Sequence, residues 1–217
     1  MPPCGRTGTG PITAVRIATA GQNSPLAAFI DTNDGRVFAK GRPSDHRRVV
    51  TQTREAAIAP FVSDISPALL WHFDEAGWNV LGYQYAPGRH ADYTPGSPDL
   101  DRLVQLMSAL SKIKVPDGHR PFKRADDRWK PYLDDPESAA VFAGPVLTHS
   151  DWTPDNVLIS AHRAWLIDWA WPTLGAGWIA SRHGAPIDPW YSTGNNNAGI
   201  YGPLAWMVVV CLGRPIL

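Results

Sequence analysis

The stretch LTHSDWTPDNVLISAHRAWLIDW, residues 147–169, decides the fold because it places polar side chains where short apolar runs begin and end. The runs PVLTH, NVLIS and AWLID have the apolar, β-branched composition of strands. His149 ends the first run, Asn156 begins the second and Asp168 ends the third, while Asp151 opens the intervening loop. Because functional groups are commonly held on loops and strand ends of a rigid frame, this stretch predicts a site.

The residue types in this stretch suit phosphoryl transfer. Such a reaction needs a carboxylate to orient and deprotonate the attacking hydroxyl, and oxygen ligands that hold magnesium against phosphate groups. We interpret Asp151 as the catalytic carboxylate, Asn156 and Asp168 as the magnesium ligands, and His149 as a brace for the loop backbone. A single loop Asp is more commonly a turn former, and we interpret Asp155 in that way.

These residues also carry a family resemblance. The pattern H-x-D-x-x-x-x-N, followed by a strand that ends in Asp, resembles the catalytic loop and metal-binding Asp of the eukaryotic-like kinase fold. The sequence THSDWTPDNVLI…LIDWAWP is more similar to the aminoglycoside phosphotransferase family than to protein kinases. The segment GYQYAPGRHADYTPGSPDL resembles the hinge and linker of actinobacterial members of that family. The resemblance covers residues 13–179. It implies ATP and Mg²⁺ as cofactors, and as acceptor a small-molecule hydroxyl, of an aminoglycoside or a related sugar.

The first third of the chain predicts a small antiparallel sheet with one inserted helix. Asn33-Asp34-Gly35 is a strong hairpin signal because Asp and Gly tolerate left-handed turn geometry. An apolar stripe beside Thr53 indicates the helix, and Pro60 is expected to end it. The stripe consists of Val49, Val50, Ala56 and Ala57. The expected strands are 14–18, 26–32, 36–41, 68–73 and 78–85, and the expected helix is 47–59.

A kinase-like site also needs a strand lysine that reaches the nucleotide phosphates and is held by a helical glutamate. VFAKG supplies Lys40 and TQTREAAI supplies Glu55. The resemblance implies that Ser24, in TAGQNSPLA, contacts phosphate together with backbone amides, although an ordinary hairpin turn explains that segment equally well. Adenine is expected at the hinge, at the backbone of Gln84 and Tyr85.

The second half of the chain predicts a long amphipathic helix and a shorter one at 137–142. Ser97 is expected to cap the long helix, with Pro98 at its first position and Asp99 in its first turn. Its apolar face consists of Leu100, Leu103, Val104, Met107 and Leu110, widened by Leu106 and Ile113. The tryptophans around the site, which are Trp152, Trp165, Trp169 and Trp171, are expected to pack rather than to stack on a ligand.

The expected fold class is therefore α+β, a bilobal protein-kinase-like fold. Its N-lobe is an antiparallel sheet with one helix, and its C-lobe is mostly helical. We expect an N-terminal nucleotide-binding lobe at 1–82, a hinge and linker at 83–97 and a C-terminal catalytic lobe at 98–179. An atypical tail at 180–217, crowded with Gly, Pro and Asn, is interpreted as a truncation or alteration of that lobe.

The amino-acid composition argues against several classes of binding partner. Lys+Arg and Asp+Glu are both 20, so the chain has no basic excess that would favour nucleic acid or an anionic membrane. The apolar run PLAWMVVVCL is about half the length of a membrane-spanning helix. The two cysteines stand at opposite ends of the chain without metal-ligand spacing. We expect a soluble, cytoplasmic protein.

Two hypotheses of different classes remain open. In the first, the protein is an ATP-dependent phosphotransferase that acts on a small molecule. In the second, it is a non-catalytic remnant of a kinase fold that binds nucleotide or a protein partner. The intact motif favours the enzyme, and the atypical tail favours the remnant. A metal-dependent hydrolase is a distant third, because such sites usually gather several His or carboxylate ligands.

Overall fold

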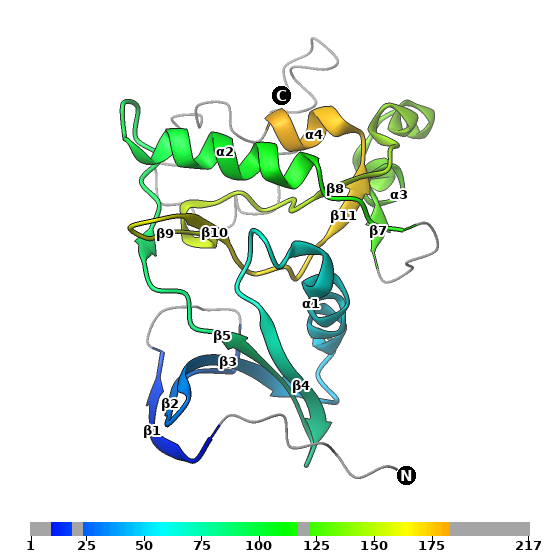
Figure 1. Ribbon diagram of the computed structural model, residues 1–217. Helices are drawn as coiled ribbons and strands as arrows, with labels where there is room; N and C mark the ends of the chain where they lie inside the picture. The colour runs from blue at the N-terminus through cyan, green and yellow to red at the C-terminus, as the bar shows by residue number, and fades with distance from the viewer. Residues whose placement is uncertain (1–9, 19–23, 117–121, 183–217) are drawn as a thin grey trace.

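The computed structural model describes residues 10–18, 24–116 and 122–182, which form two lobes (Figure 1). The N-lobe is a five-stranded sheet in the order β1-β2-β3-β5-β4, and every neighbouring pair is antiparallel. Its strands are β1 (Ile12–Ile17), β2 (Leu26–Thr32), β3 (Gly35–Pro43), β4 (Leu69–Glu75) and β5 (Trp78–Gln84). The predicted antiparallel sheet is confirmed.

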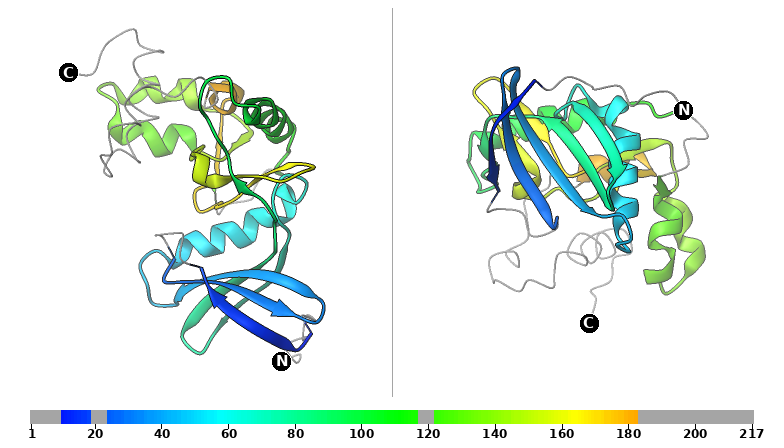
Figure 2. Two further views of the ribbon diagram at one scale, coloured as in Figure 1. Left: turned by 90° about the vertical axis from the view of Figure 1, so that its left-hand side faces the viewer. Right: turned by 90° about the horizontal axis from the view of Figure 1, so that it is seen from below.

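The single helix of the N-lobe, α1 (Val49–Val62), lies between the sheet and the C-lobe (Figure 2). It follows β3 and precedes β4, so the chain leaves the sheet, crosses its inner face and returns to pair with β5. In the β3–β5 register Lys40 is opposite Leu81, and Phe38 is opposite Tyr83. Because alternate residues of a strand share a face, Lys40 and Tyr83 point to the same side of the sheet.

The buried face of α1 differs from the predicted stripe. The buried residues are Thr51, Gln52, Glu55, Ile58, Ala59 and Val62, whereas Val50 is 44% exposed. The stripe prediction was wrong because the face that turns inward carries polar site residues. The helix also continues through Pro60 to Val62. A proline this late removes one backbone hydrogen bond, and the burial of Val62 compensates for that loss.

The C-lobe combines helices with short strands. The long helix predicted around residue 100 is α2 (Asp99–Ser111), and a β10-β9-β6 sheet and a β7-β11-β8 sheet lie beneath it. The segment predicted as a short helix at 137–142 is the 3₁₀ helix Pro136–Phe142. The remaining elements are β6 (Arg89–His90), β7 (Lys123–Arg124), α3 (Ala125–Trp129), the 3₁₀ helices Lys130–Tyr132 and Pro154–Asn156, β8 (Val146–Thr148), β9 (Val157–Ile159), β10 (Ala164–Leu166), β11 (Thr173–Gly175) and α4 (Gly177–Arg182).

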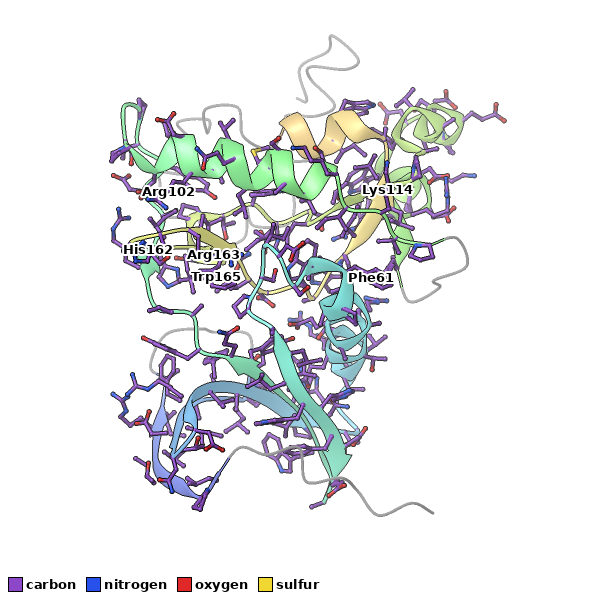
Figure 3. The ribbon with its side chains drawn as sticks, in the orientation of Figure 1. Phe61, Arg102, Lys114, His162, Arg163 and Trp165 are labelled. Atoms are coloured by element: carbon purple, nitrogen blue, oxygen red, sulfur yellow. The ribbon has the colours of Figure 1, made fainter. Side chains whose placement is uncertain are left out.

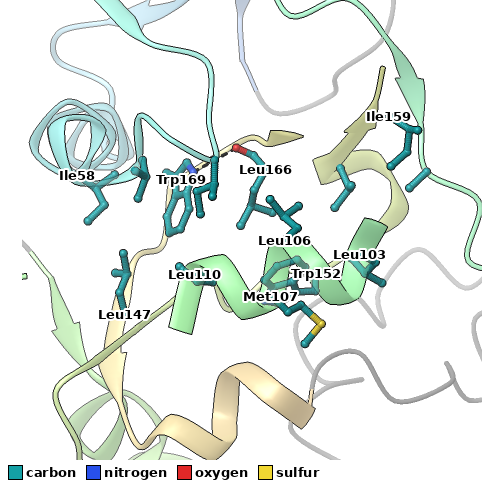
Figure 4. Packing of buried hydrophobic residues seen from close by; sticks show 14 of the residues in the cluster. Ile58, Leu103, Leu106, Met107, Leu110, Leu147, Trp152, Ile159, Leu166 and Trp169 are labelled. Carbon is teal, nitrogen blue, oxygen red and sulfur yellow. Dashed lines mark hydrogen bonds between the residues drawn. The ribbon is translucent and has the colours of Figure 1, made fainter. Parts of the chain in front are cut away.

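The main core lies between α1, α2 and the strands that carry the site (Figure 4). Leu103, Leu106, Met107 and Leu110 supply the inner face of α2. Val104 was predicted on this face but is 63% exposed, because the helix turns Leu106 inward in its place. The same core contains Ile58 and Val62 of α1 and Leu147, Val157 and Leu166 of the site strands. One core therefore joins α1 of the N-lobe to the C-lobe and the site loops.

The segment between α1 and β4 forms a second connection between the lobes. Ser66 Oγ donates a hydrogen bond to Leu166 O at 2.6 Å and accepts one from Trp169 Nε1 at 2.7 Å. The Leu166 amide donates to Ile65 O at 2.8 Å. Since Ile65 and Ser66 are buried, this N-lobe segment is anchored in the C-lobe beside the residues that precede Asp168.

The linker after β5 is held to the start of α2. Asp99 accepts hydrogen bonds from Arg89 at 2.5 and 2.8 Å and from the Asp92 amide at 2.8 Å. Gly88 has a φ of +155°, and a Cβ there would lie 2.8 Å from Ile159 O, so the linker approaches β9 too closely for a side chain. Ser97 Oγ accepts from the Asp99 amide at 3.3 Å rather than from a residue deeper in the helix.

The predicted tail at 180–217 lies outside the described residues, apart from the end of α4. No helix within the described ranges has the length and apolar character needed to cross a bilayer.

We predict that Leu110→Ala lowers the free energy of unfolding by about 2–5 kcal/mol, because Leu110 is fully buried in the main core. Val104→Ala, on the same helix but exposed, is the matched control and is expected to change it by about 0.5 kcal/mol or less. Urea unfolding of both variants tests this. Equal losses would contradict the assignment of the two helix faces.

Candidate functional site

The site is centred on the ammonium group of Lys40, which joins three elements. Lys40 Nζ lies 2.6 Å from Glu55 Oε2 on α1 and 3.0 Å from Asp168 Oδ1 at the end of the third site strand. The side chains of Lys40 and Glu55 are 11% and 4% exposed, and that of Asp168 is 32% exposed. The structure therefore brings together the predicted strand lysine, helical glutamate and loop aspartate.

Burial and charge set the protonation of these three groups. Burial lowers the pKa of Lys40, but the charges of Asp168 and Glu55 outweigh it, so the pKa is raised and the lysine stays cationic. Burial raises the pKa of Glu55 to about 7, against the attraction of Lys40. The charge of Lys40 lowers the pKa of Asp168 and outweighs its burial. Asp168 is therefore the carboxylate that remains ionised over the wider pH range.

Two residues that the sequence did not identify secure this arrangement. Tyr83 donates a hydrogen bond to Glu55 Oε2 at 3.2 Å, and burial raises the pKa of its phenol well above the usual value. Gln52 Nε2 donates to Lys40 O at 3.1 Å and so fixes α1 against β3. Tyr83 could be found only from the β3–β5 register, which places it on the face of Lys40.

Asp151 is held by its own loop. Asn156 Nδ2 donates to Asp151 Oδ2 at 2.9 Å and to Asp151 O at 3.0 Å. The 3₁₀ helix Pro154–Asn156 brings the two residues together. Burial raises the pKa of Asp151, the hydrogen bond from Asn156 lowers it, and the charge of Asp168 raises it again. The net rise makes the carboxylate a better proton acceptor near neutral pH.

His149 is buried beneath this loop and connects its two ends. Nε2 lies 2.9 Å from Ile167 O, and Nδ1 lies 3.1 Å from Asp151 O. Burial lowers the pKa of His149 to about 4, although the charge of Asp168 and both carbonyl groups oppose that change. The ring is therefore neutral near pH 7 and carries one N–H, so it donates to only one of the two carbonyl groups, which agrees with the predicted role as a backbone brace.

Asn156 and Asp168 offer side-chain oxygen atoms of the kind that Mg²⁺ binds. The Ile167 amide donates to Asn156 O at 2.9 Å, which places Asp168 beside the asparagine. The amide nitrogen of Asn156 is bound to Asp151, so its Oδ1 is left as a ligand, and Asp168 Oδ2 supplies a carboxylate oxygen. Mg²⁺ prefers hard oxygen ligands and commonly takes one or two from protein. These residues could hold a Mg²⁺ ion that also binds nucleotide phosphates.

The backbone on both sides of the site adopts unusual conformations. Among the described residues, three other than glycine have a positive φ, and two of these are Ser150 at 60° and Asp168 at 63°. Ser150 directly precedes Asp151. Positive φ is costly for most side chains and concentrates at functional sites, while Asn and Asp tolerate it better than most. The main chain thus determines the direction of both carboxylates.

The other predicted nucleotide contacts are Ser24 and the hinge residues Gln84 and Tyr85. Ser24 stands just before β2, and the adjacent residues 19–23 of the expected phosphate loop lie outside the described part. At the hinge, the Gln84 amide donates to Ala68 O at 2.8 Å and the Tyr85 amide to Arg36 O at 3.3 Å. Both amides are therefore engaged within the protein and cannot donate to a base in this arrangement.

The four tryptophans around the site divide by environment. Trp152 and Trp169 are buried in the main core, as predicted. Trp165 is partly buried and lies under Arg163 (Figure 3), whose guanidinium carbon is 3.7 Å from the ring centroid. Trp171 is 40% exposed and contacts two arginines, a feature that the sequence did not predict.

No family model matches the chain, and no curated protein sequence matches it. Solved structures do match. Choline kinase LicA from Streptococcus pneumoniae has a TM-score of 0.56 at 15% identity, over 78% of this chain and 67% of that one. Aminoglycoside phosphotransferase APH(4)-Ia has a TM-score of 0.59 at 14% identity, over 94% and 79%. A putative aminoglycoside phosphotransferase from Ralstonia eutropha JMP134 has a TM-score of 0.56 at 18% identity, over 98% and 78%.

The chain therefore has the bilobal protein-kinase-like fold that small-molecule phosphotransferases share. The similarity to APH(4)-Ia and choline kinase establishes the fold that the sequence predicted, and identities of 14–18% extend no further than the fold.

We predict that acid destabilises the protein through His149. The folded-state pKa of about 4 lies below the ordinary value of 6.5, so the unfolded chain binds the proton first as the pH falls. The stabilisation by neutral His149 is complete above pH 6.5 and is lost as the pH falls to about 4, with a slope of up to about 1.4 kcal/mol per pH unit. Urea unfolding of the native protein and His149→Asn between pH 4 and 7 measures the difference. Parallel pH profiles would contradict a buried neutral imidazole.

Proposed function

We propose that the protein is an ATP-dependent phosphotransferase that moves the γ-phosphoryl group to a hydroxyl of a small molecule. The observation that carries this proposal is the Lys40–Glu55–Asp168 cluster beside the Asp151–Asn156 pair. Phosphoryl transfer depends on positioning and charge stabilisation more than on covalent chemistry by the protein. A buried lysine, two magnesium-type ligands and a partly buried carboxylate supply these requirements in one place.

Each residue is assigned a role in this proposal. Lys40, held by Glu55, would bind the nucleotide phosphates, and Asp168 and Asn156 would hold a Mg²⁺ ion that stabilises the phosphate charge. Asp151 accepts the proton of the acceptor hydroxyl, since its pKa is raised and its carboxylate is oriented by Asn156. Ser24 contacts phosphate. The carbonyl groups of Gln84 and Tyr85 bind the base at the hinge.

Nucleotide binding is supported by the structures that share the fold. One is a ternary complex of a thermostable mutant of APH(4)-Ia with AMP-PNP and hygromycin B, with a TM-score of 0.57. Its nucleotide analogue favours ATP as the phosphoryl donor here. The similar structures do not point to one acceptor, because they include a choline kinase, LicA, and APH(4)-Ia, which binds hygromycin B.

The second candidate is a kinase-fold protein that binds nucleotide or a partner without turnover. In the structure Lys40 lies 3.0 Å from Asp168, so the proposed metal ligand already holds an ion pair. An arrangement that stayed closed in this way would bind Mg²⁺ more weakly, because only Oδ2 of Asp168 is left for the cation and Lys40 neutralises the carboxylate. A nucleotide titration separates the two candidates.

We predict that ATP with Mg²⁺ raises the melting temperature of the native protein by roughly 5–10 °C at a hundredfold excess over Kd. Asp168→Asn is expected to lose the Mg²⁺-dependent part, because the substitution removes the negative charge that attracts the cation. Asn tolerates the positive φ of this position, so the variant keeps the backbone geometry. Thermal unfolding with ATP alone, Mg²⁺ alone and both together measures the effect.

Asp155→Ala is the matched control for this titration. Asp155 is exposed on the same loop and belongs to no proposed ligand set, so the nucleotide shift should remain. If folded native protein shows no shift, the phosphotransferase proposal fails and a partner-binding role gains support.

A separate prediction concerns Asp151. We expect Asp151→Asn to keep the nucleotide-dependent thermal shift but to lower phosphoryl transfer about 10²–10⁴-fold, the usual contribution of a general base. ADP release with a panel of hydroxyl compounds measures transfer. Undiminished transfer in this variant would remove Asp151 from the reaction.

A further inference from the structure

Two arginines from different lobes meet at Trp171, close to the proposed catalytic carboxylate. Arg54 precedes Glu55 on α1, and its guanidinium carbon lies 5.2 Å from the Trp171 ring centroid. Arg128 belongs to α3 and lies 5.4 Å from the same centroid. Trp171 follows closely after Asp168 in the chain. Both arginines therefore lie beside the site but are not among the residues proposed to bind nucleotide or Mg²⁺.

Arg128 is fixed in place by the loop that carries Asp151. Its Nη1 donates to Thr173 Oγ1 at 2.7 Å, to Ser150 Oγ at 3.0 Å and to Trp171 O at 3.2 Å. All three bonds use one nitrogen. Among the described residues Nη2 and Nε of Arg128 contact no acceptor, so the rest of the guanidinium fork is available. An arginine held by one nitrogen is pre-organised to bind an oxyanion with the others.

The charges around Trp171 are unbalanced. Arg36, Arg89 and Arg124 each form an ion pair with a carboxylate. Within the described part of the chain, neither Arg54 nor Arg128 has a carboxylate within ion-pair distance. Burial lowers the pKa of Arg128, the charge of Arg54 lowers it further and Asp151 raises it. Two partly buried cations thus repel each other beside Asp151, and an anion between them would relieve the repulsion.

We propose that Arg54 and Arg128 bind an anionic group, a carboxylate or a phosphate, on the acceptor whose hydroxyl Asp151 orients. This inference rests on the proposed function and narrows its substrate class. Bidentate contacts from arginine suit both anions, and two arginines from opposite lobes would place the acceptor between them. The same charges disfavour a polycation at this position, so they argue against the aminoglycoside-like acceptor that the sequence resemblance implied.

The first arm of the test measures anion binding, with sulfate as the probe. Thermal unfolding is followed in sulfate and in chloride at matched ionic strength, with and without saturating Mg²⁺ and AMP-PNP, for the native protein and for Arg54→Gln, Arg128→Gln and Arg163→Gln. Arg163 is the matched control, since it also lies over a tryptophan but near the β9–β10 turn, across the C-lobe from α3 (Figures 1 and 3).

We expect saturable stabilisation by sulfate in the native protein and in Arg163→Gln, and its loss in Arg54→Gln and Arg128→Gln. Arg54→Gln keeps the test valid if Arg128→Gln fails to fold, because Arg54 makes no hydrogen bond with the described residues. Sulfate binding that disappears when Mg²⁺ and AMP-PNP are present would assign the arginines to nucleotide phosphates and overturn the inference. Equal effects in all four proteins would overturn it as well.

The second arm measures turnover of acceptors in matched pairs, such as glycerol with glycerol 3-phosphate and serinol with serine, together with polycationic aminoglycosides. We expect transfer to favour the member of each pair that carries a phosphate or carboxylate group, and Arg54→Gln to raise the KM of that member about 10-fold or more while kcat changes less, since a charged hydrogen bond is lost. A preference for neutral or cationic acceptors would overturn the inference. Failure of the nucleotide titration would instead defeat the proposed function, whatever the sulfate result.

Discussion

The interaction on which the structure depends is the nearly buried ion cluster around Lys40. One ammonium group faces two carboxylates, and only Asp168 keeps appreciable solvent contact. Removing one member of a buried ion pair is strongly destabilising because the remaining charge loses its partner. β3, α1 and the loop after β10 must therefore keep their relative positions, and the hydrogen bonds from Tyr83 and Gln52 reinforce this constraint.

This constraint explains why some elements could be predicted from the sequence and others could not. The β2–β3 hairpin was predictable because its turn signal is local, and α2 because its apolar face is regular. The inner face of α1 was not, because Gln52 and Glu55 take positions that a hydrophobic pattern assigns to apolar residues. Polar site residues on the buried face of a helix interrupt the regular spacing of apolar residues from which that face would be predicted.

The residues of the site likewise fall into those that the sequence could indicate and those that it could not. Asp151, Asn156 and Asp168 lie in one short stretch, so their spacing along the chain is enough to indicate their chemistry. Tyr83, Arg54 and Arg128 act through contacts between distant elements, and no local pattern marks them. Arg54 could be suspected only once Glu55 had fixed the orientation of α1, and Arg128 only once α3 had been placed beside Ser150.

The anchoring of Ile65 and Ser66 in the C-lobe has a mechanical consequence. The chain passes between the lobes at the hinge after β5, and the α1–β4 segment holds them together at a second point through Leu166 and Trp169. Two lobes that are joined at two separate points can rotate relative to each other only about the line through those points. Any relative rotation of the two lobes is thereby limited to one axis, and Ser66 lies at one of the two fixed points.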